Sequence, residues 1–307
     1  MIMYEENYTY PVGSLRDLAK ANEIINVLKK RSILVNYSQD LETNEYHLFC
    51  EKESNLEESR IVFLQTMGLY KKSYEPDPSY VLIKSLPMTQ VTLFCILFSI
   101  LIYIASEFYS REQVFQYLTI ANDMSKFLFE VKSGEIYRLL TPIFLHFNFM
   151  HILFNLMWLK DLGKIIEKHL GATRFILMII ALGISSNMVQ YLIRGPNFGG
   201  MSGVVYGLLG YLWIFKKFNE DSDLIGLPKR DIYMMVGWFV LCMTGILGPI
   251  ANLAHGMGLT LGMIFGSWPL KGVVKWKWFF IAIIALAITI VVELVKVKGI
   301  MYFTLLL

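Results

Sequence analysis

One serine and three histidines stand in apolar stretches of this 307-residue chain. Ser202 lies among five glycines in "NFGGMSGVVYGLLGY" (197–211), His255 lies in "AHGMGLTLG" (254–262), and two histidines lie in "HFNFMHILFN" (146–155). A serine hydroxyl becomes an effective nucleophile when a neutral imidazole within hydrogen-bond reach takes its proton. The pattern therefore predicts acyl-transfer chemistry in which Ser202 attacks and His255 acts as base.

Acyl transfer also needs hydrogen-bond donors for the developing oxyanion. His151 and Asn155 are four residues apart and share a helix face, so with the Ser202 backbone N–H they could supply these donors. The same two residues could equally form a hydrogen bond across helices. Tyr206, one turn after Ser202, could stack on the imidazole, and we interpret His146 as a structural residue that holds the adjacent loop.

The composition is that of a membrane protein. Hydrophobic residues make up 55% of the chain and charged residues only 17%. The net charge of +3 is small and dispersed, which disfavours nucleic acid as a partner. Cys50, Cys95 and Cys242 are far apart, so we interpret them as packing residues. The first residues lack the pattern of a cleavable signal peptide, and we expect the N-terminus to stay in the cytoplasm.

Residues 1–75 are predicted to form a small cytoplasmic α+β domain. Its expected elements are a strand at "YTYPV", a helix after Ser14 as a possible cap, strands at "SILVNYS" and "EYHLFC", and a helix in "NLEESRIVFLQTMGLY". The Pro-containing residues 76–88 are predicted to be a linker. A membrane domain follows at 89–271, and residues 272–307 are predicted to hold an additional transmembrane helix and a tail.

Seven apolar runs predict seven membrane spans, of which the fourth is short. They lie near 89–106, 142–163, 172–193, 202–215, 232–249, 250–270 and 277–295. Lys and Arg are concentrated in alternate loops, and this places the N-terminus on the cytoplasmic side. Glu293 lies near the last boundary, where we expect it to snorkel to the surface. No buried carboxylate is then available as a third catalytic member, so the expected unit is a dyad.

Counting about 1.5 Å per helical residue from the inner charges puts three polar groups at one level. Ser202 is about 21 Å above Lys216, His255 about 24 Å above Lys271, and His151 about 20 Å above Lys164. This level is roughly 6–10 Å below the outer surface, and irregular backbone there must be shielded or line a wet cavity. Stripes of small residues would let two of the helices approach closely. They are Gly258, Gly262 and Gly266 on one helix and Gly203, Gly207 and Gly210 on the other.

Three motifs, "GMSG" (200–203), "HFNFMHILFN" (146–155) and "AHGMGLTLG" (254–262), resemble the signature of the rhomboid intramembrane serine proteases. The layout is most similar to the bacterial GlpG group, whose cytoplasmic domain the 1–75 module also resembles. The resemblance implies an all-α polytopic membrane protein with a rhomboid-like six-helix bundle, a seventh C-terminal transmembrane helix and the small α+β domain.

The resemblance also implies the roles of the site residues. Ser202 would be the nucleophile, His255 the general base and acid, and His151, Asn155 and the Ser202 amide the oxyanion hole, while Gly200 leaves backbone room beside the nucleophile. The implied activity is a serine endopeptidase that needs no cofactor or metal and cleaves transmembrane segments of membrane proteins. The substrate would enter sideways between spans two and five, with "GILGPIAN" as a lid.

The resemblance implies further that the protein lies in the inner (plasma) membrane, with the site open to the extracytoplasmic side. The lipid bilayer is a partner, and self-association is open. Two features depart from the family pattern. The loop after the first span carries Tyr137-Arg138 where the family commonly has Trp-Arg, which leaves the anchoring of that loop in doubt, and the seventh span exceeds the six of the GlpG core.

Three other functions are compatible with parts of the sequence. A zinc protease is disfavoured because "HILFN" has Ile152 where the HExxH motif needs a glutamate. A transporter would fit the short span and the intramembrane loop, but repeat symmetry and a coupling carboxylate are missing. A rhomboid-like pseudoprotease that binds membrane helices without hydrolysis would usually lack the serine or the histidine. It remains the alternative function.

Overall fold

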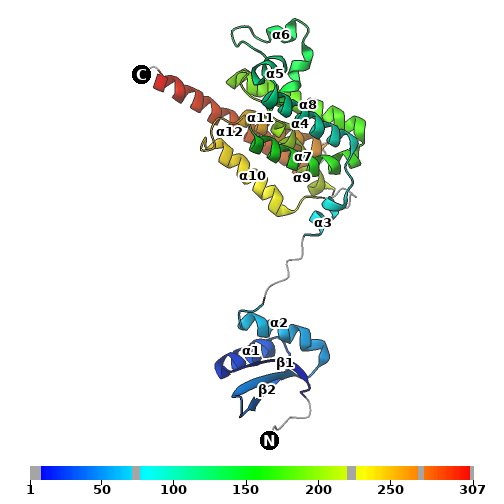
Figure 1. Ribbon diagram of the computed structural model, residues 1–307, viewed down its shortest axis with the longest axis vertical. Coiled ribbons are helices and arrows are strands. Elements are labelled where there is room, and N and C mark those ends of the chain that lie inside the picture. Colours follow the sequence, from blue (N-terminus) through cyan, green and yellow to red (C-terminus); the bar gives the residue numbers. More distant parts are fainter. Residues whose placement is uncertain (1–7, 71–76, 220–225, 269–272, 305–307) are drawn as a thin grey trace. The chain divides into compact units, whose positions relative to one another are not determined.

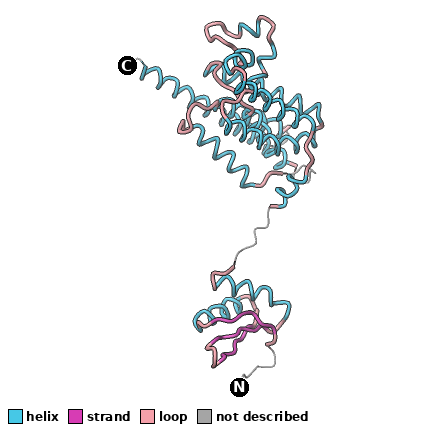
Figure 2. Tube along the Cα trace, in the orientation of Figure 1, coloured by secondary structure: helices cyan, strands magenta, loops and turns pink. Residues whose placement is uncertain are grey.

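The computed structural model describes residues 8–70, 77–219, 226–268 and 273–304. The chain divides into two compact units, Met1–Glu75 and Pro76–Leu307. Strands occur in the first unit, and the described part of the second is built from helices and loops (Figure 2). The beginning of the chain (1–7), residues 71–76, of which only residue 76 belongs to the predicted linker, and Lys271, the reference for the depth of His255, lie outside the described residues.

The first unit is an antiparallel sheet with two helices packed against it (Figure 1). The strands β1 (Tyr10–Leu15), β2 (Val35–Asp40) and β3 (Glu45–Cys50) are arranged in the order β1-β3-β2. Helices α1 (Leu18–Lys30) and α2 (Leu56–Thr66), the latter preceded by the short 3₁₀ helix η1 (Glu53–Asn55), contribute apolar side chains to a common core. The order strand, helix, strand, strand, helix agrees with the order expected from the sequence.

The predicted cap of the first helix is wrong. Ser14 belongs to β1, where its hydroxyl lies 2.6 Å from His47 Nδ1 on the neighbouring strand. The N-cap is Asp17, whose carboxylate accepts hydrogen bonds from the backbone N–H groups of Ala19 and Lys20. Asp is as good an N-cap as Ser, and Asp17 directly precedes the first helical residue, Leu18.

Part of the predicted linker is helical. Residues 78–85 of the range 76–88 form α3 (Pro78–Ser85). Asp77 caps this helix by accepting from the Ser79 N–H, and Pro78 occupies the first helical position. Proline is favoured there because its missing N–H would have no partner within the helix. One of the prolines in the predicted linker, Pro78, therefore begins a helix.

In the described part of the second unit, seven long helices overlap the seven apolar runs. They are α4 (Gln90–Phe108), α7 (Phe149–Leu170), α8 (Ala172–Arg194), α9 (Ser202–Phe218), α10 (Lys229–Met243), α11 (Asn252–Ser267) and α12 (Val273–Thr304). Among the described residues, three segments are long and apolar enough to cross a membrane by length and composition: Gln90–Phe108, Ala172–Arg194 and Lys275–Val297. A count of seven crossings therefore remains a prediction.

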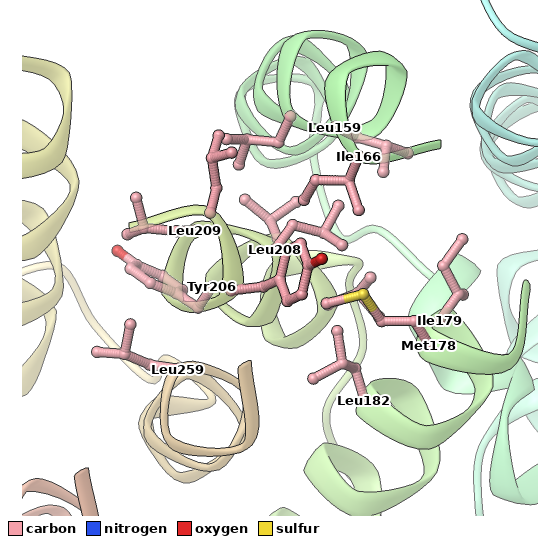
Figure 3. Close-up of a cluster of buried hydrophobic side chains, with 14 of the residues drawn as sticks. Leu159, Ile166, Met178, Ile179, Leu182, Tyr206, Leu208, Leu209 and Leu259 are labelled. Carbon is pink, nitrogen blue, oxygen red and sulfur yellow. The ribbon is translucent and has the colours of Figure 1, made fainter. Parts of the chain in front are cut away.

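Helix α9 forms the centre of the second unit. Every residue from 203 to 212 is buried. Figure 3 shows its Leu208 and Leu209 among side chains of the three surrounding helices. Those neighbours are Leu159 and Ile166 of α7, Met178, Ile179 and Leu182 of α8, and Leu259 of α11. A helix that is apolar on all sides is buried on all sides, and Ser202 is the first residue of this enclosed helix.

Helices α9 and α11 approach until their backbones touch. A Cβ atom added to Gly258 would overlap the Gly203 carbonyl, and one added to Gly262 would overlap the Gly207 carbonyl. The two glycine stripes expected from the sequence therefore face each other. This α9–α11 contact determines the separation of the two helices that carry Ser202 and His255.

The buried carboxylate of Glu167, near the end of α7, caps helix α4. It accepts hydrogen bonds from the backbone N–H of Val91 (2.9 Å) and from the N–H and hydroxyl of Thr92 (both 2.8 Å). One turn earlier on α7, Gly163 lies directly against the Thr92 side chain. A negative charge at a helix N-terminus satisfies otherwise unpaired N–H groups and interacts favourably with the helix dipole. The start of α4 is thereby fixed to α7.

The segment between α4 and α7 is held by Arg138. It contains α5 (Arg111–Leu118), α6 (Phe129–Lys132) and the 3₁₀ helices η2 (Ile136–Leu139) and η3 (Thr141–Phe144). The Arg138 side chain is buried and donates to the carbonyls of Gln116 (2.6 Å) and Thr119 (3.0 Å) and to the Glu135 carboxylate (2.7 Å). The Tyr137 hydroxyl donates to the same carboxylate. These two hydrogen bonds, from Tyr137 first and Arg138 second, lower the pKa of Glu135.

Arg138, the neighbour of Tyr137, anchors the segment between α4 and α7 whose anchoring was in doubt. Arg138 makes the contacts that join the end of α5 to the start of η2, and these contacts are present with tyrosine in place of tryptophan. The Tyr137 ring itself is exposed.

Candidate active site

Ser202 and His255 are in direct contact. Ser202 Oγ lies 2.7 Å from His255 Nε2, although 53 residues separate them in the sequence. Ser202 is the first residue of α9 and is partly exposed, whereas His255, in the first turn of α11, is buried. The distance is that of a hydrogen bond. For Nε2 to accept from the hydroxyl, the ring proton must be on Nδ1.

Aromatic rings enclose the imidazole. The Tyr206 ring centroid lies 4.8 Å from that of His255 at an angle of 39°, and Phe239 of α10 lies 6.1 Å away at 65°. The Tyr206 hydroxyl donates to the Met235 carbonyl, which fixes the tyrosine. His255 Nδ1 is buried and has no hydrogen-bond partner among the described residues. The imidazole is therefore oriented by ring packing, and no described carboxylate binds its second nitrogen.

His151 and Asn155 lie beside the loop that precedes Ser202. A side chain at Gly200 would collide with His151 Nε2 at 2.6 Å and would come within 3.8 Å of Asn155 Nδ2. Gly200 has a φ of +119°, which favours glycine for a second reason. Asn155 donates to the His151 carbonyl at 2.9 Å, which uses one of its two amide hydrogens. The Asn155 amide and the His151 ring thus lie beside Gly200, two residues before Ser202.

The N-terminus of α7 positions these two residues. Asn148 is the N-cap and accepts from the His151 N–H at 2.8 Å. His146 is buried, its Nδ1 lies 3.1 Å from the Phe144 carbonyl oxygen, and its ring packs edge-on against His151 at 5.1 Å. His146 therefore supports His151 and the preceding turn and does not reach Ser202 by any contact described here.

Buried backbone contacts hold the loop before Ser202. The Gly200 N–H donates to the Pro142 carbonyl at 3.0 Å, and Gly199 lies so close to Leu145 that a Cβ would collide with it. Residues 199 and 200 are thus attached to η3 and to Leu145, which follows it. Gly200, which also lies against His151, is two residues before Ser202 at the N-terminus of α9.

Sequence reasoning missed the amide side chains around the first turn of α11. Gln190 of α8 accepts from the Ala254 N–H at 3.3 Å. Asn252 Nδ2 donates to the Cys242 carbonyl (3.2 Å) and to Glu293 (3.0 Å). The expectation that Glu293 snorkels is wrong, since it is only 2% exposed. The missed signal was a polar amide in each of two apolar runs, Gln190 in 172–193 and Asn252 in 250–270. Only titratable groups were treated as unusual at membrane depth.

Comparison with known proteins indicates the family that the chain resembles. Residues 133–272 match the family model described as the Rhomboid domain. A segment of 186 residues is 36% identical to Rhomboid protease GlpG of Yersinia enterocolitica serotype O:8 / biotype 1B, and it covers 60% of this chain and 64% of that protein. A segment of 179 residues is 35% identical to Rhomboid protease GlpG of Photorhabdus laumondii subsp. laumondii, with coverage of 58% and 61%.

A third relative matches more closely over a shorter stretch. Rhomboid protease GlpG of Yersinia pestis (strain Pestoides F) is 41% identical over 135 residues, which are 44% of this chain and 48% of that protein. The aligned parts therefore cover less than two thirds of the length of these relatives.

The fold and the matches define a multi-pass helical membrane protein that carries a rhomboid domain. The chain is similar to proteins of the GlpG group of the rhomboid family. The family resemblance of the three sequence motifs is thereby confirmed.

Proposed function

We propose that this protein is an intramembrane serine endopeptidase that cleaves transmembrane segments of other membrane proteins with a Ser202–His255 dyad. The observation that carries the proposal is the 2.7 Å contact between Ser202 Oγ and His255 Nε2 at the partly exposed N-terminus of α9. The similarity to relatives named Rhomboid protease GlpG supports the same reaction class.

In the proposed reaction, Ser202 Oγ attacks the carbonyl carbon of the scissile peptide bond, and its proton moves to His255 Nε2. The carbonyl oxygen becomes an oxyanion that accepts hydrogen bonds from the Ser202 N–H, Asn155 Nδ2 and His151. His255 returns the proton to the departing amine, which leaves an acyl ester on Ser202. Water, deprotonated by His255, then hydrolyses the ester and restores the hydroxyl.

The arrangement around His255 favours a dyad without a carboxylate. Tyr206 and Phe239 restrict the ring by packing, as an aspartate would by hydrogen bonding. His146 acts through His151, and Gly200 leaves the space in which His151 and Asn155 meet the loop. The reaction as written draws on these protein groups and water alone, and we assign it no cofactor.

We propose that the substrate helix reaches Ser202 sideways, between α7 and α10. The rings of Phe154 and Trp238 lie 5.9 Å apart where these helices face each other, and both are exposed. The residues 245–252 would act as a lid. Gly245 and Gly248 have φ values of +83° and +85°, and Ile246 is 79% exposed. The substrate must unwind locally, because a hydrogen-bonded helix does not present its carbonyl to a nucleophile.

The proposed placement is the inner membrane with seven crossings, the N-terminus and unit 1–75 in the cytoplasm, and the site facing the extracytoplasmic side. Lysines at the ends of α9 and α10 opposite the site support this orientation. Accessibility of cysteines introduced at positions 30 and 246 to a membrane-impermeant reagent tests it: only position 246 should react in intact cells.

The test of the activity is reconstitution of the full chain in liposomes with a model transmembrane substrate. We expect Ser202→Ala and His255→Ala each to lose activity by at least about a thousandfold. The matched controls are Ser14→Ala and His47→Ala, because this second serine–histidine contact (2.6 Å) lies in the other unit. Both controls should retain wild-type activity.

Two results would contradict the mechanism. Cleavage that survives Ser202→Ala, or that a chelator abolishes, would exclude the serine dyad. Binding of a range of substrate helices by the wild type without any cleavage would establish the pseudoprotease alternative.

A further inference from the structure

Helix α12 contacts the face of α11 that points away from α9. Asn252, Gly256 and Thr260 recur every four residues on α11 and therefore lie on one face. A Cβ at Gly256 would lie 3.0 Å from Thr289 Oγ1, and the Thr260 hydroxyl donates to the Ala282 carbonyl at 3.1 Å. Figure 1 shows the red helix α12 beside α11. The seventh helix is therefore attached to the helix that carries His255.

The strongest of these contacts is at the outer end, where Glu293 meets Asn252. The Glu293 carboxylate accepts from Asn252 Nδ2 at 3.0 Å and from Lys296 Nζ at 2.7 Å, and Arg194 of α8 lies 3.7 Å away. Burial of a carboxylate is costly unless it is paired and hydrogen-bonded. Two cations and one amide meet this need, so the carboxylate is held in one position.

Asn252 links the Glu293 carboxylate to the first turn of α11. Its amide is held at the same time by the Cys242 carbonyl at the end of α10 and by Glu293. The N-cap residue of α11, Ala251, has no side chain able to cap the helix. Asn252 is three residues before His255, in the same helical turn. A shift of this turn would move the imidazole relative to Ser202, which is fixed on α9.

We propose that Glu293 is a positioning residue for catalysis: through Asn252 it fixes the first turn of α11 and thereby holds His255 Nε2 against Ser202 Oγ. This inference rests on the proposed function. It assigns to the seventh helix, beyond the six of the bundle, a part in aligning the dyad.

The experiment uses the full chain in liposomes and four variants. Glu293→Leu removes the acceptor, and Glu293→Gln keeps an amide oxygen for Asn252 while it removes the charge. Asn252→Ala removes the link and leaves Glu293 paired with Lys296 and Arg194. Val291→Ala is the matched control, because Val291 is on the same helix and 58% exposed. The readouts are kcat and KM for a model substrate and the rate at which a fluorophosphonate labels Ser202.

We expect Glu293→Leu and Asn252→Ala to lower kcat about 10- to 100-fold, the size of effect that a 1 Å misplacement produces. KM should change less than about threefold, because the substrate-binding surface is unaltered. Labelling of Ser202 should slow in parallel. Glu293→Gln should recover most of the activity, and Val291→Ala should match the wild type.

A merely structural role for α12 gives a different result. It would lower the amount of folded protein while kcat per labelled Ser202 stays at the wild-type value, and this would overturn the proposal. Should Glu293→Leu fail to fold, Asn252→Ala decides alone: normal kcat and labelling in that variant would overturn the proposal. A wild type that neither cleaves nor labels at Ser202 would instead reject the proposed function itself, and the positioning role with it.

Discussion

The two faces of α11 are held in opposite ways. Towards α9, Gly258 and Gly262 bring backbone against backbone, and there is no room for one further carbon atom. Towards α12, the contact is made by side chains, with hydrogen bonds from Asn252 to Glu293 and from Thr260 to the Ala282 carbonyl. One face is determined by shape and the other by polar partners.

This difference indicates how the helix is positioned for catalysis. A backbone contact fixes the distance between two helices rigidly, because a close-packed interface cannot absorb added atoms. Hydrogen bonds between membrane helices contribute little each, about 0.6 kcal/mol on average. We therefore expect the α9–α11 contact to set the separation of Ser202 and His255, and the α12 contact to set the orientation of the first turn.

The largest expected effect comes from Gly262→Val. The added side chain would collide with the Gly207 carbonyl and push α11 away from α9. We expect a loss of activity of about 100-fold or more and a destabilisation of about 3 kcal/mol, measured by substrate cleavage and by thermal unfolding in detergent.

Gly237→Ala is the matched control for unfolding, because a Cβ at Gly237 meets nothing within 4 Å. It should unfold at the wild-type temperature or slightly above, since alanine favours helix. If Gly262→Val unfolded like the wild type, the α9–α11 contact would not be the rigid one.

The second-largest effect is expected from Glu167→Ala at the contact of α4 with α7. Both close packing and hydrogen bonding hold Thr92 at this contact. Gly163 touches Thr92 by shape, and Glu167 accepts from it by hydrogen bonding. Because the carboxylate satisfies two backbone N–H groups and a hydroxyl, we expect about 3 kcal/mol of destabilisation. Chemical denaturation measures it, with the exposed neighbour Lys168→Ala as control. A loss below that of the control would show that shape alone holds this contact.

A smaller effect is expected from Thr260→Val on the polar face of α11. The substitution keeps the shape of the side chain and removes one hydrogen bond to the Ala282 carbonyl. We expect about 0.6 kcal/mol of destabilisation and a kcat within about threefold of the wild type. Thr260→Ser, which keeps the hydroxyl, should unfold closer to the wild type. A loss as large as that of Gly262→Val would remove the distinction between the two faces.

The same distinction explains what the sequence could predict. The glycine stripe on α11 is a local pattern at helical spacing, and the sequence therefore predicted its close contact with α9. The motifs around Ser202, His151 and His255 likewise predicted which helices meet, because polar groups at one membrane depth favour each other. These features are encoded by spacing within single helices.

The polar contacts were not predictable in this way. Glu293 was expected to reach the surface, because its position near a span end is compatible with that. Lys296 is its neighbour on α12, but only the tertiary structure brings Arg194 and Asn252 to it. Asp17 took the place of Ser14 as helix cap for a similar reason, since Ser14 is paired within the sheet. Partners distant in sequence leave no periodic signal.

The smallest effect is expected at the half-buried Glu135. Tyr137 and Arg138 lower the pKa of its carboxyl group from the ordinary value of 4.5. A lowered pKa in the folded state stabilises the protein above pH 4.5, and this stabilisation is lost as the pH falls through the folded-state value. Tyr137→Phe removes the larger contribution, so its melting temperature should fall less than that of the wild type between pH 7 and about pH 3.5. Tyr109→Phe, at a residue that is 80% exposed, should follow the wild-type curve. Equal pH dependence of all three proteins would mean that the Tyr137 hydrogen bond does not affect stability. A loss of stability in Tyr137→Phe as large as that in Glu167→Ala would instead place the contact between Tyr137 and Glu135 among the rigid contacts.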